Sequence, residues 1–272
     1  INEIRESARK LLEQGCEALS IIFINSYAND ENEKIAKGAI QDIWPNEHIT
    51  VSSEILPEIR EFERASTSTL NAVLQPVLSH YLGALEETLT KKGFLGQALI
   101  VQSNGGVMSI DNAKALPIKT ALSGPAAGVI AASYIGVNAG YPNIVSCDMG
   151  GTSFDVSLIS GGQSKLAAQT SIDFGMVVRS PMVEIITIGA GGGSIAKVDA
   201  GGLLQVGPES AGSDPGPVCY GLGTTTPTVT DANVVLGRIN PESPIGGRLE
   251  RLNVDAALDA INFHVAKPLG ID

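Results

Sequence analysis

Residues 147–159 read CDMGGTSFDVSLI, which places an acid before two glycines and two hydroxyl residues. Backbone N–H groups that no Cβ shields can approach phosphate oxygens, and hydroxyl groups add further donors. Asp148 stands where a carboxylate could hold a water molecule of a bound Mg²⁺. The pattern therefore indicates a phosphate-binding turn. Its members are Gly150, Gly151, Thr152 and Ser153.

A plainer interpretation of this stretch stays open. A two-residue type I′ hairpin turn needs positive φ at both central positions, and that alone would account for Gly150 and Gly151. Asp155 would then be a structural residue that faces outward on the second strand. The turn by itself does not decide between a phosphate loop and a simple connection of two strands.

A second glycine-rich segment, residues 189–194, reads GAGGGS. It lacks the last glycine of a G-x-G-x-x-G fingerprint and the G-K-[ST] of a Walker A loop. One interpretation is a turn whose backbone packs closely against a neighbour. The other is a loop that faces a nucleotide or substrate through Gly191, Gly192 and Gly193.

Three further polar sites favour structural interpretations. Cys219 is expected to be a small buried hydrophobe, because no residue near it in sequence would lower its pKa. Asp231 is expected to cap a helix. The charged run at residues 61–64 is typical of a solvated or salt-bridged helix face, although a role between two lobes is also open.

The composition limits the class of protein. With 272 residues, 43% of them hydrophobic and 17% charged, the chain suits one large or two ordinary domains with a sizeable core. A net charge of −11 argues against a nucleic-acid or membrane-surface partner. Three scattered cysteines and three scattered histidines indicate neither a disulfide framework nor a metal cluster, so we expect a cytoplasmic protein. No signal peptide or membrane span is recognisable.

The remaining pattern predicts alternating helices and strands. Helices are expected over residues 4–12, 30–44, 61–93 (bent near Pro76), 124–140 and 228–239. Strands are expected over residues 18–24, 49–55 and 97–103, with a hairpin over 143–159. Residues 189–223 are too rich in turns for helices, and they predict short strands and ordered loops. The last helix would be capped by Thr230 or Asp231, and a boundary between two α/β units falls near residues 118–125.

The order of helix, strand, glycine turn and strand in SGPAAGVIAASYIGVNAGYPNIVSCDMGGTSFDVSLI resembles the ATPase core of actin, sugar kinases and the seventy-kilodalton heat-shock chaperones. The resemblance implies actin-like, ribonuclease-H-like α/β lobes, with mixed sheets flanked by helices and a glycine-rich insertion. Residues 1–120 would end the first lobe and residues 121–272 would begin the second. Asp148 would act through Mg²⁺ and water, while Gly150, Gly151 and Thr152 would grip ATP phosphates.

Within this superfamily, five further stretches that occur in a fixed order point to one family: EILPEIREFERASTSTLNA, VQSNGGVMS, LSGPAAGV, IGAGGGSIAKVDAGG and PTVTDANVVLGRINP. Together they resemble the A-type subunit of the ATP-dependent hydantoinase/5-oxoprolinase family. This implies ATP and Mg²⁺, a small cyclic amide or ketone substrate, a B-type partner subunit or region, and an oligomer. The expected reaction opens a cyclic amide through carbonyl phosphorylation. A ketone carboxylase subunit and a non-catalytic actin-like scaffold are the alternatives.

Some positions depart from the family pattern. Phe154 stands where a small polar residue is usual, and Leu222 and Thr224 replace an Arg and a Gly, which leaves the substrate open. The first phosphate loop and the adenosine-binding motif of the superfamily are not recognisable in this chain. We therefore expect an internal fragment that binds ATP weakly or not at all alone. Calorimetry that shows micromolar MgATP binding would refute this.

Overall fold

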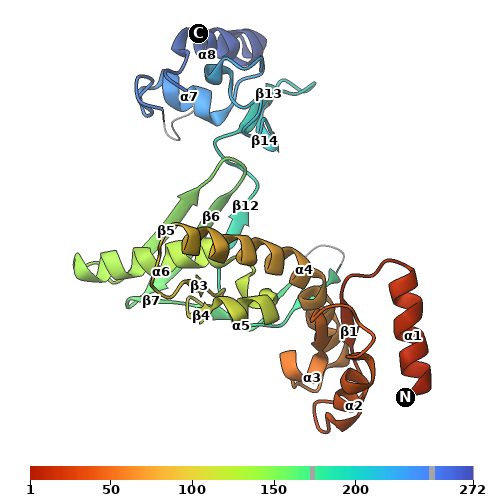
Figure 1. The fold of residues 1–272 in the computed structure, drawn as a ribbon. Helices are drawn as coiled ribbons and strands as arrows, with labels where there is room; N and C mark the ends of the chain where they lie inside the picture. Colours follow the sequence, from red (N-terminus) through yellow and green to blue (C-terminus); the bar gives the residue numbers. More distant parts are fainter. Residues whose placement is uncertain (172–174, 245–248, 272) are drawn as a thin grey trace. The chain divides into compact units, whose positions relative to one another are not determined.

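The computed structural model describes residues 1–171, 175–244 and 249–271 (Figure 1). The chain divides into two compact units. Unit 1 comprises Ile1–Ile144 and Ile159–Glu184, and unit 2 comprises Val145–Leu158 and Ile185–Asp272. Helices and several small sheets occur together, so the expected α/β class is confirmed. The division into two ATPase lobes at residue 120 stays a prediction.

The N-terminal part of unit 1 is a small parallel α/β layer. Its elements are α1 (Asn2–Glu13), β1 (Leu19–Ile21), α2 (Glu31–Ile40) and β2 (Ile49–Val51). β1 and β2 run parallel, with Leu19 opposite Ile49. Ala8, Ile40 and Trp44 are among the buried residues that pack the helices onto these strands.

The rest of unit 1 is arranged around a long helix. In chain order its elements are α3 (Ser52–Ile55), α4 (Glu61–Lys91), β3 (Leu99–Val101), β4 (Val107–Ser109), α5 (Ile110–Ala115), η1 (Pro117–Thr120) and α6 (Ser123–Asn138). β3 and β4 form an antiparallel pair, and Leu82 of α4 packs against Met108. Short strands complete the unit: β7 (Gln163–Ser164), β8 (Leu166–Ala167), β9 (Thr170–Ser171), β10 (Val177–Val178) and β11 (Met182–Val183).

A hairpin leads into unit 2. β5 (Ile144–Met149) and β6 (Phe154–Ser160) lie side by side, and β12 (Ile186–Ile188) pairs antiparallel with β6. The elements that follow are β13 (Ser194–Val198), β14 (Leu204–Ser210), η3 (Val218–Tyr220), α7 (Val229–Val235), α8 (Val254–Ile261), η4 (Asn262–Ala266) and α9 (Lys267–Leu269). Cys219, Val234 and Ala257 are buried together in the core of this unit.

Most predicted elements are confirmed, with two corrections. The strand predicted over residues 49–55 is wrong in its second half, because Ser52–Ile55 forms α3. The predicted N-cap of the helix expected over residues 228–239 is also wrong. Thr228 is the N-cap of α7, and Asp231 is the third residue of the helix, where it completes a capping box.

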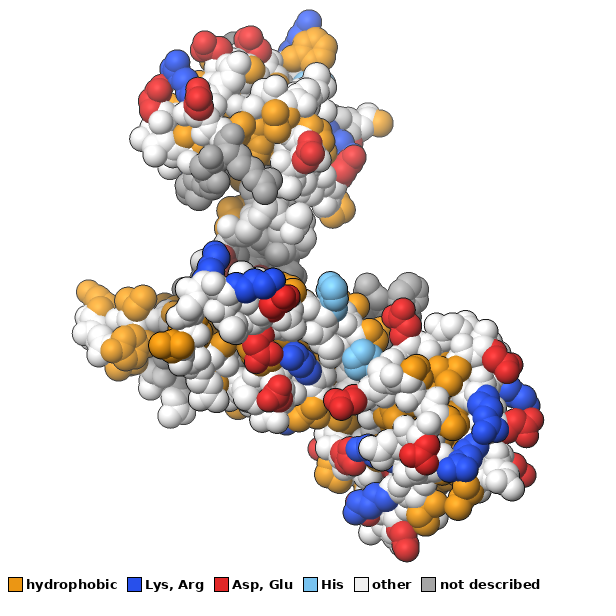
Figure 2. Space-filling model, in the orientation of Figure 1, with side chains coloured by type: hydrophobic (Ala, Val, Ile, Leu, Met, Phe, Trp, Pro, Cys, Tyr) orange, Lys and Arg blue, Asp and Glu red, His pale blue; other side chains and the backbone are white. Residues whose placement is uncertain are grey.

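Charges of both signs are interspersed on the face of the molecule that Figure 2 shows. Many belong to exposed ion pairs, such as Lys10 with Glu6 on α1 and Lys34 with Asp30 beside α2. Each such pair contributes little to stability. No helix within the described ranges has the length and the apolar character needed to cross a membrane.

Candidate phosphate-binding site

The turn between β5 and β6 consists of residues 150–153 and is closed by one hydrogen bond, from the N–H of Gly150 to the carbonyl of Ser153 (2.9 Å). Neither Gly150 nor Gly151 has a left-handed φ, so the type I′ interpretation is wrong. A Cβ on Gly151 would meet no atom within 4 Å, and one on Gly150 only the Ser153 carbonyl at 3.7 Å. Neither backbone conformation nor packing among the described residues requires glycine at these two positions.

The tip of this turn presents hydrogen-bond donors. Gly151 and Thr152 are both exposed, and their backbone N–H groups have no partner among the residues that the structure describes. Successive backbone N–H groups in a turn can bind an anion, and a nearby hydroxyl can add a further donor. Asp148 is exposed near the end of β5, two residues before Gly150.

The glycine-rich segment lies against this turn. The N–H of Gly192 donates to the Gly150 carbonyl (2.9 Å), and the N–H of Gly193 donates to the Gly151 carbonyl (2.7 Å). A Cβ on Gly191 would lie 2.6 Å from backbone atoms of Gly151 and Thr152. The structure thus brings the two predicted glycine segments together, and close backbone packing accounts for the glycine at position 191.

The far side of the glycine-rich segment is fixed by two hydroxyl residues, Ser194 and Thr230, for which the sequence did not predict this supporting role. Thr230 donates to the Gly192 carbonyl through both its N–H (2.7 Å) and its Oγ1 (2.8 Å). Ser194 Oγ accepts the N–H of Gly191 (2.8 Å). The N–H groups of residues 191–193 are therefore all engaged within the chain. Nucleotide binding by these glycines stays a prediction, and the visible role of the segment is to support the turn.

Asp231 is a buried structural acid. It is fully buried at the start of α7, and its carboxylate accepts hydrogen bonds from the N–H groups of Thr228 (2.8 Å), Val218 (3.2 Å) and Cys219 (2.7 Å). The Thr228 hydroxyl adds a fourth (2.9 Å). Asp231 thereby joins α7 to η3 and takes part in the capping box of α7, although the N-cap itself is Thr228. The T-x-x-D spacing of residues 228–231 is the sequence signal that would have identified the correct N-cap.

Cys219 is not a reactive thiol. It is buried, and burial raises its pKa to about 12, with the neighbouring Asp231 carboxylate adding to the shift. A thiol becomes a good nucleophile only when its pKa is lowered. The interpretation of Cys219 as a small buried residue is therefore confirmed.

Other predicted positions lie around the hairpin or farther along unit 2. Asp155 on β6 accepts a hydrogen bond from the Thr187 hydroxyl of β12 (2.6 Å), which agrees with its structural interpretation. Phe154 starts β6 and is half-buried. Leu222 is exposed, and the Thr224 hydroxyl donates to the Gly216 carbonyl. Across the described ranges, no three His, Cys, Asp or Glu residues gather in a group that could hold a metal ion.

The charged run at residues 61–64 differs from its sequence interpretation at one position. Arg64 is fully buried, so the solvated alternative is wrong for this residue, whereas its ion pair with Glu61 confirms the salt-bridged alternative. Its guanidinium donates to the Phe23 carbonyl (2.6 Å) and lies 3.5 Å from the Glu61 carboxylate. Alternating charges in a sequence do not show which of them has a buried partner, and here the partner is a backbone group 41 residues away.

A comparison with protein-family models finds a match over residues 64–272, to the model described as Hydantoinase/oxoprolinase. The chain belongs to the hydantoinase/oxoprolinase family. It is 40% identical over 276 residues to the acetophenone carboxylase gamma subunit of Aromatoleum aromaticum. It is 39% identical over 259 residues to the caprolactamase subunit alpha of Pseudomonas jessenii.

These alignments cover 99% and 95% of this chain but 37% of each relative. The 5-oxoprolinase of Saccharomyces cerevisiae is 36% identical over 243 residues, which is 89% of this chain and 18% of the yeast protein. This member of the hydantoinase/oxoprolinase family thus spans well under half the length of these relatives. The resemblance that the sequence motifs indicated is confirmed.

Solved structures give the same result. An acetone carboxylase in its nucleotide-free form matches all of this chain with a TM-score of 0.79 and 31% identity, over 38% of its own length. The ATP-dependent caprolactamase from Pseudomonas jessenii matches 99% of this chain with a TM-score of 0.77 and 38% identity, over 39% of its own length. The fold is therefore shared with both kinds of enzyme.

Proposed function

We propose that this chain is part of an ATP-dependent enzyme that opens a cyclic amide of the hydantoin or 5-oxoproline type. Family membership supports the proposal, as do relatives named caprolactamase and 5-oxoprolinase. The observation that carries it is the exposed tip of the turn after β5, where Gly151 and Thr152 offer two backbone donors without a partner among the described residues. ATP is the anion that such a turn would bind in this family.

In this reaction the substrate carbonyl attacks the γ-phosphoryl group of ATP, and the protein only has to hold that group in position. A lactam carbonyl is a poor electrophile because its nitrogen donates electrons into it. When the carbonyl oxygen attacks the γ-phosphorus of ATP, the bond to ADP breaks and the ring carbon gains a good leaving group. Water then adds to that carbon, and the ring C–N bond breaks as the nitrogen takes a proton, which leaves an acyl phosphate. A second water molecule hydrolyses the acyl phosphate to a carboxylate and free phosphate. Positioning and neutralising the phosphoryl charge is the main task of the enzyme.

The residues of the turn fit this task. The N–H groups of Gly151 and Thr152 would hold phosphate oxygens, and the hydroxyls of Thr152 and Ser153 would add donors. Asp148 would hold Mg²⁺ through water, as Mg²⁺ sites that contain one or two carboxylates and substrate phosphates commonly do. Mg²⁺ would supply charge neutralisation at the transferred group. The glycine segment 191–193 would keep the turn in place.

A ketone carboxylase subunit is the second candidate. The relative with 40% identity is an acetophenone carboxylase subunit, and an acetone carboxylase has the same fold. Both reactions need ATP phosphate held by the same turn, so the roles assigned to the turn do not separate them. Because relatives of both kinds are named as subunits, we also propose a partner subunit of B type and an oligomer. The scattered cysteines support a cytoplasmic location.

Gly151→Ala in the full-length protein tests the phosphate role. Folding should be unaffected, because a Cβ at this position meets no atom within 4 Å. The KM for ATP should rise by at least about tenfold, because the methyl group would occupy the space that phosphate approaches. The measurement is phosphate release against ATP concentration, with circular dichroism to monitor the fold. An unchanged KM would contradict the proposed phosphate contact.

Gly189→Ala is the matched control, because Gly189 also has open space around its Cβ position and lies outside the turn. We expect its KM for ATP to stay within twofold of the unchanged protein. A rise of equal size in both variants would show that the effect does not come from the phosphate-binding turn.

A further inference from the structure

Residues 191–193 of the glycine-rich segment lie between two other segments of unit 2. On one side, the N–H groups of Gly192 and Gly193 donate to carbonyls of the turn after β5. A Cβ on Gly193 would lie 2.9 Å from the Gly151 carbonyl oxygen on this side, and 2.8 Å from Ser210 Oγ on the other. Even one methyl group would therefore collide with both neighbours, and the segment is held in place from both sides.

Thr230 bonds twice to this segment. Its N–H (2.7 Å) and its Oγ1 (2.8 Å) both donate to the Gly192 carbonyl, and the Gly192 N–H donates to the Gly150 carbonyl (2.9 Å). A Cβ on Gly192 would lie 2.8 Å from Thr230 Oγ1, so this contact also depends on glycine. Gly192 thus connects Thr230 to the first residue of the turn through its own backbone groups.

The first turn of α7 gives Thr230 a fixed position. Thr228 is the N-cap, and it forms a capping box with Asp231. The Asp231 carboxylate is fully buried and also accepts the N–H groups of Val218 and Cys219. Hydrogen bonds to a charged acceptor are stronger than neutral ones. Because Thr230 lies between the two residues of the capping box, its hydroxyl is presented from a rigid support.

Strand β13 holds the residues before α7 as well. The N–H of Ala196 donates to the Pro227 carbonyl (2.8 Å), and Ile195 forms an isolated antiparallel bridge with Thr228. β13 continues directly from the three glycines of the glycine-rich segment. The segment and the start of α7 are therefore joined at two places, along β13 and at Thr230.

We propose that Thr230 is a positioning residue for ATP, which acts on the phosphate-binding turn through Gly192. This inference rests on the proposed function. The Thr230 hydroxyl fixes Gly192, and the Gly192 N–H holds the Gly150 carbonyl, directly before the exposed N–H groups of Gly151 and Thr152. Thr230 itself would not contact phosphate. Groups that bind a ligand need such support, because a site that is about 1 Å too loose loses its function.

Thr230→Val in the full-length protein removes the hydroxyl and keeps the branched shape of the side chain. The N–H of residue 230 still bonds to Gly192, so the fold should be retained. We expect the Kd for MgATP, measured by calorimetry, to rise about fivefold, the factor that corresponds to one neutral hydrogen bond. Thr230→Ser, which keeps a hydroxyl, should stay within twofold. An unchanged Kd in Thr230→Val, or an equal rise in Thr230→Ser, overturns the inference.

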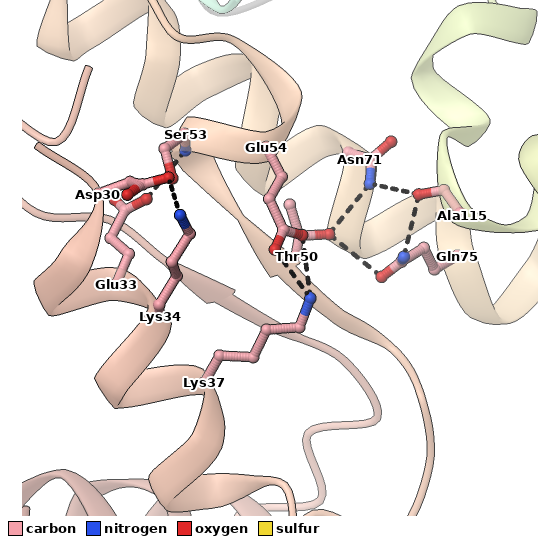
Figure 3. Close-up of polar contacts among 10 residues, drawn as sticks. All are labelled: Asp30, Glu33, Lys34, Lys37, Thr50, Ser53, Glu54, Asn71, Gln75 and Ala115. Carbon is pink, nitrogen blue, oxygen red and sulfur yellow. Dashed lines mark hydrogen bonds and ion pairs between the residues drawn. The ribbon is translucent and has the colours of Figure 1, made fainter. Parts of the chain in front are cut away.

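Thr50→Val is the matched control, because it removes a buried threonine hydroxyl from unit 1. Thr50 Oγ1 donates to Gln75 (3.1 Å) and accepts from Asn71 (3.0 Å), and both amides donate to the Ala115 carbonyl (Figure 3). Breaking this network should lower the thermal midpoint at least as much as Thr230→Val does, because buried polar groups lose their partners. The Kd for MgATP should stay within twofold well below that midpoint. A rise in Kd of equal size in both variants overturns the inference.

Hydrogen exchange without nucleotide separates this inference from the proposed function. In Thr230→Val we expect faster exchange of the N–H groups of Gly192 and Gly193, which donate to the turn, and no change in Thr50→Val. Phosphate release is measured separately, with MgATP and hydantoin, caprolactam or 5-oxoproline. Faster exchange and a raised Kd without such phosphate release would contradict the proposed function but retain the inference. Unchanged exchange of these two N–H groups in Thr230→Val overturns the inference.

Discussion

At the scale of single residues, Asp231 shows how one acid can organise several backbone segments. Its carboxylate accepts four hydrogen bonds from α7 and η3 while it is fully buried. Such bonds to a charged acceptor are stronger than neutral ones, and leaving the donors unpaired would cost free energy. The predicted cap was therefore correct in function, but the N-cap itself is Thr228.

Asp231→Asn should lower the free energy of unfolding by about 2–4 kcal/mol. The backbone N–H groups that now donate to the carboxylate would instead face the NH₂ group of asparagine, which is itself a donor. At least one of them would lose its acceptor. Asp255→Asn is the control, because Asp255 is exposed in the first turn of α8, and its effect should be within about 0.5 kcal/mol. Denaturant titration measures both. Equal stability of Asp231→Asn and the unchanged chain would contradict the structural role.

Cys219 should resist alkylation in the folded protein. Burial raises its pKa to about 12, whereas Cys147 is exposed on β5. Iodoacetamide at pH 8 should therefore modify Cys147 and leave Cys219 intact until denaturant is added. Mass spectrometry of the peptides distinguishes the two sites. Modification of both cysteines at the same rate would contradict the burial of Cys219.

The raised pKa of Cys219 also has a consequence for stability. The folded state binds the thiol proton more tightly than the unfolded state, where the pKa is near 9.0. The contribution of this group to stability is therefore complete below pH 9 and is lost as the pH rises toward 12. A Cys219→Ala variant should show a weaker decline in this alkaline range.

At the scale of elements, the site is a pair of backbone segments that pack through glycine. The sequence shows that residues 150–153 and 189–194 are glycine-rich, but it does not show that they contact each other. Their adjacency depends on β12 pairing with β6 and on Thr230 holding Gly192. Neither interaction has a local sequence signal, so the contact had to come from the structure.

Gly191→Ala should separate these two segments. A Cβ at this position would lie 2.6 Å from backbone atoms that cannot move aside like a flexible side chain. We expect a loss of about 1–3 kcal/mol in the free energy of unfolding, comparable with overpacking a core. Gly189→Ala, with open space around its Cβ position, should have little effect. If the two variants were equally stable, the close packing of the segments would be contradicted.

Helix and strand types were largely predictable from periodicity, whereas their ends were not. The end of β2 is decided by Ser52, whose hydroxyl bonds to Glu33 on α2. Arg64 is similar, because its burial depends on the Phe23 carbonyl, which is remote in the sequence. Such long-range partners cannot be recognised from neighbouring residue types. For this reason the strand was predicted too long and Arg64 was predicted on a solvated or salt-bridged face.

At the scale of the whole molecule, the ordered motifs were enough to predict the family. The motifs lie in loops, strands and helix starts, and their fixed order is what identifies the family. The chain spans 37% of the length of two bacterial relatives, so its activity, substrate and partners are proposals. The proposed phosphate turn would serve lactam hydrolysis and ketone carboxylation equally well, so the motifs do not choose between the two reactions.

The central claim is that the turn after β5 serves ATP-dependent activation of a cyclic amide. The most direct test is phosphate release by the full-length protein, with its partner subunit, on hydantoin, 5-oxoproline, caprolactam, acetone and acetophenone. The account predicts release coupled to ring opening of a cyclic amide, and its loss in Asp148→Asn with the fold retained. Phosphate release with none of the cyclic amides, or release unchanged by Asp148→Asn, would contradict it.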